Sequence, residues 1–234
     1  MNLSTLLSDP VEFLIELLYL VPCVLITLSV HEAAHAFAAL KMGDESQRYR
    51  GRISLNPFRH VDPIGFLLLL VVGFGWAKPV NVNPYAFKNP KKGMALTALA
   101  GPVSNFLLTF VGMFLCYLFT YVQYVSGAEG TASLVLYILM QFFYYLAIMS
   151  AGLGLFNLIP LPPLDGSRVV SAFLRGRAYD AYAQLERYGF LILAGILLIG
   201  NYLPALDIIG NGLTVARGWI INACDAVMRL IFRV

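Results

Sequence analysis

The sequence predicts an all-α polytopic membrane protein with about five or six transmembrane helices. A small β-hairpin or re-entrant element is expected between the helix that carries HEAAH (residues 31–35) and the helix that carries GPVSN (residues 101–105). The first supporting observation is composition, since 59% of the 234 residues are hydrophobic and 12% are charged. The second is a mean hydropathy of +0.74. Such a chain has more apolar surface than one core can bury, so we expect a single membrane-embedded domain over residues 1–234.

The apolar runs define the expected helices in order. Asp9 and Pro10 favour a helix start, and Gly43 favours an end. The run 64–76 is short for a span, and the run 213–232 is amphipathic and suits either a crossing or a surface helix. About four spans are therefore expected, or five or six if these two runs cross, with a core at about 14–175 and C-terminal helices at about 188–234. The runs are 14–40, 64–76, 94–125, 132–159, 188–203 and 213–232.

Two extended stretches flank the short run. RYRGRISLNPF (48–58) precedes it and KPVNVNPYAF (78–87) follows it. In the second stretch, valine and asparagine alternate, which is the period of a strand, and the prolines confine such a strand to an edge. These stretches are the basis for the predicted β-hairpin.

Basic residues orient the chain. They gather in three loops, after the first run, before the third and after the fourth, whereas the loop SGAEGT (126–131) has no lysine or arginine. The positive-inside rule therefore places the three basic loops in the cytoplasm and 126–131 outside. The net charge of +3 is too small and scattered to indicate a nucleic-acid partner. The isolated cysteines predict neither a disulfide framework nor a cysteine zinc site.

The motif HEAAH places His31, Glu32 and His35 inside an apolar run, where ionisable side chains are costly and usually functional. Residues four apart share one helix face, so His31 and His35 can ligate one metal ion, and Glu32 can act as a general base on water. His35 precedes Lys41 by six residues, or about 9 Å of helix, which places the site below the cytoplasmic headgroups.

Catalytic zinc usually has three protein ligands, and the residues leave a choice for the third. One candidate is His60, the remaining histidine, in LNPFRHVDPIG (55–65). The other is Asp165 in NLIPLPPLDG (157–166), where prolines end the fourth run and could aim a carboxylate at the metal. Asn105 and Asn157 could donate hydrogen bonds to a substrate carbonyl or its oxyanion, or equally serve as contacts between helices.

Together, these residues resemble the site-2 protease family of intramembrane zinc metalloproteases. The motifs are HEAAH, NPFRHVDPIG, GWAKPV, AGPVSN and NLIPLPPLDG, in that order over about 29–170. Within the family, the chain resembles the compact bacterial and archaeal group, which is marked by a stretch of the GWAKPV type. The resemblance implies one zinc ion held by His31, His35 and Asp165, with Glu32 activating water and with Asn105 and Asn157 near the scissile carbonyl.

The apolar runs, the basic loops and the depth of the site, together with this resemblance, predict the protein's surroundings and partners. The protein is expected to be a multi-pass protein of the cell membrane, with its active site toward the cytoplasm. Its expected partners are the lipid bilayer and the transmembrane proteins that serve as substrates. A rival hypothesis is a catalytically silent, metal-binding scaffold or chaperone for membrane helices, against which the intact Glu32 argues. A metal-ion transporter is a further alternative, but it predicts ionisable residues along a path, whereas here they gather at one depth.

Overall fold

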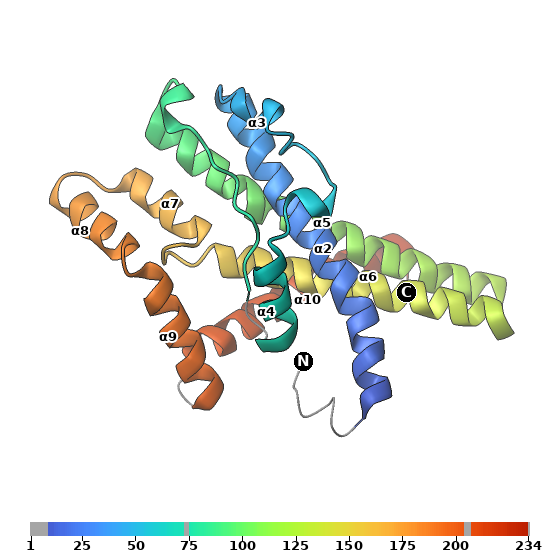
Figure 1. Ribbon diagram of the computed structural model, residues 1–234. Coiled ribbons are helices and arrows are strands. Elements are labelled where there is room, and N and C mark those ends of the chain that lie inside the picture. Colours follow the sequence, from blue (N-terminus) through green and yellow to red (C-terminus); the bar gives the residue numbers. More distant parts are fainter. Residues whose placement is uncertain (1–8, 73–74, 204–206, 234) are drawn as a thin grey trace.

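The computed structural model describes residues 9–72, 75–203 and 207–233, and most of these are helical (Figure 1). α5 and α6 pack side by side as an antiparallel pair, α2 crosses them, and α7, α8 and α9 form an arm to one side. The elements are α2 (Pro10–Met42), α3 (Ser46–Tyr49), η1 (Pro57–Arg59), α4 (Pro63–Val72), η2 (Pro84–Ala86), α5 (Pro90–Ser126), α6 (Gly130–Asn157), α7 (Asp165–Phe173), α8 (Arg177–Glu186), α9 (Gly189–Tyr202) and α10 (Ile208–Phe232).

The ends of α2 follow from local chemistry and confirm the expected start and stop. The Asp9 side chain accepts hydrogen bonds from the backbone N–H groups of Val11 and Glu12, and Pro10 occupies the first turn, where its missing N–H is not needed. At the other end, Gly43 adopts a left-handed conformation with φ 118°. A side chain at this position would be strained, so the glycine ends the helix.

Among the described residues, three helices, α2, α5 and α6, are long and apolar enough to cross a membrane, and α8 with α9 would make a fourth span bent by 63°. The predicted count of five or six is therefore not confirmed. α4 has ten residues and rises about 15 Å, half the thickness of the hydrocarbon core. α10 has 25 residues but carries Arg217, Asp225 and Arg229, so it falls outside the group of apolar spans.

The predicted β-hairpin is also not confirmed, because the described residues contain no sheet and one isolated antiparallel bridge, between Val61 and Ala77. Side chains occupy the backbone groups that a ladder would use. The Arg52 guanidinium donates to the carbonyls of Lys78 and Pro79, and the Val80 N–H donates to Glu32. Segment 76–83 is consequently extended but held by side chains.

The interior of the helix assembly is built from small and polar residues. The Thr27 and Ser150 hydroxyls lie 3.0 Å apart and join α2 to α6, while Gly112 of α5 packs against Ala147 of α6. Small residues of this kind allow helices to approach closely within a membrane. Large apolar side chains instead face outward on all three helices, as expected for a lipid-facing surface; they include Leu14, Leu18, Leu107, Val111, Leu134 and Val135.

Candidate metal centre

Three side chains that are distant in sequence converge where α2, α5 and α7 meet. The Nε2 atoms of His31 and His35 lie 3.0 Å apart, and Oδ2 of Asp165 lies 3.0 Å from the first and 3.1 Å from the second. The histidines are buried, and the Asp165 side chain is 13% exposed. Within the described parts of the chain, this is the group of histidine and acidic side chains arranged to hold a metal ion.

The spacing of these atoms fits zinc. Ligand atoms about 2.0–2.1 Å from a tetrahedral ion lie roughly 3.3 Å from one another, close to the distances observed. Gly101 of α5 makes room for this arrangement, because a β-carbon there would lie 2.5 Å from Nε2 of His35 and 2.6 Å from Cε1 of His31. The two rings therefore pack directly on the α5 backbone.

The other ring nitrogens contact α5, and these contacts bear on which tautomer each ring adopts. Nδ1 of His35 lies 2.7 Å from the Thr97 carbonyl oxygen, to which it can only donate, so Nε2 of a neutral ring keeps its lone pair for a metal. The Asn105 side chain lies behind His31, with its amide 3.0 Å from Nδ1.

The orientation of the Asn105 amide follows from the same reasoning. With Nδ2 toward His31, the buried Oδ1 atom has no hydrogen-bond partner. Turning the amide over lets Nδ1–H of His31 donate to Oδ1, which satisfies that oxygen and leaves Nε2 of His31 for a metal. The orphaned oxygen therefore fits a pair of metal-ligating histidines.

Asp165 owes its position to the turn that follows α6. Prolines at 160, 162 and 163 cannot continue the helix, and the chain reverses so that Asp165 becomes the first residue of α7. A β-carbon on the next residue, Gly166, would lie 2.2 Å from the Leu158 carbonyl oxygen, so the turn requires glycine. Burial alone would raise the pKa of Asp165, but the two imidazoles hold it well below its usual range, and the carboxylate is ionised at neutral pH.

Glu32 is buried beside His31 on α2, and its carboxylate accepts a hydrogen bond from the extended segment 76–83. The Val80 N–H donates to Oε2 of Glu32 at 3.1 Å. A carboxylate that accepts this single backbone bond keeps further lone pairs for a water molecule or a substrate amine. The arrangement can thus support proton transfer next to a metal ion.

The structure does not bring the other candidates to the cluster. His60 is fully buried, its Nε2 lies 2.6 Å from the Ser54 carbonyl oxygen, and burial lowers its pKa. Asn157 is the last residue of α6 and donates to the Leu153 carbonyl of its own helix. An oxyanion role for Asn105 or Asn157 stays a prediction.

Sequence reasoning missed three contacts of the site: the Thr97 carbonyl, the Val80 N–H and the packing of both rings on Gly101. The role of Gly101 could have been found from the sequence, because Gly101 lies four residues before Asn105 and therefore on the same face of α5, the face that was expected to contact the site. The other two contacts are made by backbone atoms, so residue type carries no signal for them.

Comparison with known proteins decides the family. The model of "Peptidase family M50" matches residues 19–200. The chain belongs to peptidase family M50, the site-2 protease family. Members of family M50 use zinc, in keeping with the donor set of two histidines and one aspartate.

Several family M50 relatives carry names that state a chemistry. "Putative zinc metalloprotease YwhC" of Bacillus subtilis is 40% identical over 187 residues, covering 79% of this chain and 83% of that protein. "Putative zinc metalloprotease Rip2" of Mycolicibacterium smegmatis is 27% identical over 78% of this chain and 66% of its own length. "Putative zinc metalloprotease MJ0611" of Methanocaldococcus jannaschii is 31% identical over 60% of this chain and 62% of its own length. No solved structure matches the chain.

Proposed function

We propose that this chain is an intramembrane zinc protease that hydrolyses peptide bonds within or near the transmembrane segments of membrane-protein substrates. The observation that carries the proposal is the meeting of Nε2 of His31, Nε2 of His35 and Oδ2 of Asp165 within 3.1 Å, with Glu32 beside them. The three atoms come from apolar, membrane-type helices and from the turn that follows them. A substrate bond cleaved here would itself lie at membrane depth.

His31, His35 and Asp165 would hold the zinc ion. When bound, zinc polarises a substrate carbonyl and acidifies water. The carboxylate offsets one of the two positive charges, which two neutral imidazoles alone would leave uncompensated in a low-dielectric site. Thr97 and Asn105 keep the two rings oriented from behind.

Glu32 would act as the general base and then as the general acid. It takes the proton of the attacking water and returns it to the leaving amine. Its bond to the Val80 N–H fixes the carboxylate against the extended segment, so the proton acceptor is in place before a substrate arrives. By the distribution of basic loops, the protein is a multi-pass protein of the cell membrane with this site toward the cytoplasm.

The test compares wild type with Glu32→Gln, which keeps the volume but cannot accept the proton. Glu12→Gln, an exposed change in the first turn of α2, is the matched control. We expect Glu32→Gln to retain stoichiometric zinc by metal analysis and to lose about 10²–10⁴-fold in cleavage. Proteomic comparison of membrane fragments from cells that express each form identifies the substrates.

Two outcomes would contradict the proposal. Near-normal turnover by Glu32→Gln excludes a zincin mechanism. Identical fragment patterns in cells with wild type, Glu32→Gln and no protein at all would favour the catalytically silent scaffold, which needs the metal ligands but not the base.

A further inference from the structure

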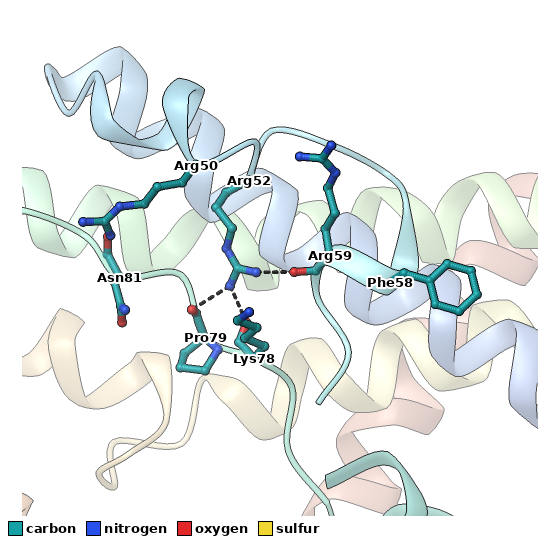
Figure 2. A pocket seen from close by; sticks show the side chains of 7 residues that line it. All are labelled: Arg50, Arg52, Phe58, Arg59, Lys78, Pro79 and Asn81. Atoms are coloured by element: carbon teal, nitrogen blue, oxygen red, sulfur yellow. Dashed lines mark hydrogen bonds between the residues drawn. The ribbon is translucent and has the colours of Figure 1, made fainter. Parts of the chain in front are cut away.

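A basic hollow of about 410 Å³ lies between the α2–α4 connection and the extended segment (Figure 2). Its lining holds four cationic side chains and no acidic one; the residues are Arg50, Arg52, Phe58, Arg59, Lys78, Pro79 and Asn81. Like charges brought together in this way repel one another unless an anion joins them. The hollow therefore has the charge of an anion-binding site.

Arg52 forms the floor of this basic hollow. Its guanidinium donates to the carbonyl of Arg59 on one side and to the carbonyls of Lys78 and Pro79 on the other, so it joins the two walls (Figure 2). Burial lowers the pKa of Arg52, and the neighbouring charge of Arg50 lowers it further, while Glu32 acts in the opposite sense. No carboxylate in the described part of the chain lies within ion-pair distance of Arg52.

Arg50 and Arg59 also line the basic hollow. One N–H of Arg50 donates to the Asn81 carbonyl and one N–H of Arg59 donates to the Gly51 carbonyl, each at 3.0 Å. A guanidinium has five N–H donors, so both side chains retain donors for the oxygen atoms of a phosphate. The Lys78 ammonium makes no hydrogen bond or ion pair within the described residues, which leaves it available to the same ligand.

One large apolar side chain lines the basic hollow, and two more lie nearby in the sequence. Phe58 lines it and is 91% exposed, and Leu55 and Ile53 of the same connection are also exposed. In Figure 2 the Phe58 ring points away from the guanidinium groups. A ligand that matches both features carries an anionic head and an apolar tail.

We propose that this hollow binds the phosphate-bearing headgroup of an anionic phospholipid, with an acyl chain against Phe58 and Leu55. Basic clusters next to a transmembrane helix on its cytoplasmic side attract anionic lipids. Here, four such side chains line one hollow. The lipid would then contact Pro79 and Asn81, which flank Val80, the residue whose N–H donates to Glu32.

The experiment is native mass spectrometry of the purified full chain, titrated with phosphatidylglycerol, phosphatidylcholine, glycerol phosphate and a polyglutamate peptide. We expect wild type to bind one phosphatidylglycerol at least tenfold more tightly than phosphatidylcholine. Each removed charge should weaken phosphatidylglycerol binding about fivefold, so Lys78→Gln loses about fivefold and Arg50→Gln with Arg59→Gln about 25-fold. Binding of phosphatidylcholine should not change.

The matched control removes two charges elsewhere on the basic side, Arg175→Gln with Arg177→Gln, and should bind like wild type. Equal loss in this control would overturn the proposal in favour of diffuse surface charge. Wild-type binding by Lys78→Gln, whose ammonium has no structural contact to lose, would overturn it as well. Glycerol phosphate bound as tightly as the lipid would indicate a soluble phosphate ligand, and a polyglutamate peptide bound as tightly would indicate an acidic protein segment.

Discussion

An alanine at Gly101 would put a methyl group into the space that the two imidazole rings occupy. The added β-carbon would lie 2.5 Å from Nε2 of His35 and 2.6 Å from Cε1 of His31, whereas ordinary contacts between such atoms are about 3.5–4.0 Å. The rings would have to retreat by about 1 Å, or α5 would have to move by a similar amount. Distances between zinc and its ligand atoms are expected to stay within about 0.2 Å of their usual values.

We therefore expect Gly101→Ala to weaken zinc binding about 100-fold, the upper end of what changes behind metal ligands usually cost, which corresponds to about 2.7 kcal/mol. Competition with a chromogenic chelator at fixed pH measures the affinity directly and does not depend on a substrate. Overpacking should also lower the stability of the metal-free protein by about 1–3 kcal/mol. Thermal unfolding with and without zinc separates the two effects.

Two other glycines serve as matched controls. Gly112 lies on the same helix, and a β-carbon there would lie 2.9 Å from the Phe143 carbonyl oxygen, so Gly112→Ala should lower stability but leave zinc affinity unchanged. Gly152 has space, with the nearest atom 3.9 Å away, and Gly152→Ala should change neither. Wild-type zinc affinity in Gly101→Ala would refute the packing argument, and an equal loss of affinity in Gly112→Ala would show that the effect is a general consequence of disturbing α5.

Three further predictions concern the ligands and the topology. Asp165→Ala should severely reduce both zinc occupancy and cleavage. His60→Ala should keep zinc near stoichiometric, because the His60 ring contacts the Ser54 carbonyl and not the metal cluster. Metal analysis of both variants tests this, and the reverse result would exclude the ligand assignment. Asn105→Ala should weaken zinc binding about 10–100-fold, while an aspartate there keeps an acceptor oxygen for His31 and should stay within about tenfold of wild type in the same chelator competition. In a background without native cysteines, Lys91→Cys should resist an impermeant thiol reagent in intact cells and Glu129→Cys should react; labelling of the former would mean that the basic loop before α5 is outside.

The parts of the protein that could be predicted are those determined by local chemistry. The start of α2 at Pro10 and its end before Gly43 follow from residues within one turn of each boundary. His31 and His35 could be paired because helical spacing alone brings them to one face. Bringing Asp165 to them required a motif, because 134 residues separate it from His31.

The missed features depend on contacts between distant backbone segments. Valine and asparagine alternate in 78–83 as in a strand. The backbone groups that a neighbouring strand would use are instead hydrogen-bonded to the side chains of Arg52 and Glu32. The number of spans stays a prediction, because the crossing of the short run 64–76 and of the amphipathic run 213–232 depends on how the helices pack in the membrane and not on hydropathy alone. Such outcomes are decided by tertiary structure rather than by propensity.

The proline turn before α7 has a consequence for how the protein holds together. An ion bound by His31 and Asp165 would close a loop that contains α5, α6 and the whole extended segment, with its ends 134 positions apart in the sequence. Such an ion acts as a reversible cross-link, because opening the loop requires first releasing the metal. Chelation would therefore remove the covalent-like link between α2 and α7 and leave the packing of α7 on α5 to hold this end of the turn in place, so we expect metal occupancy to contribute to the stability of the whole assembly.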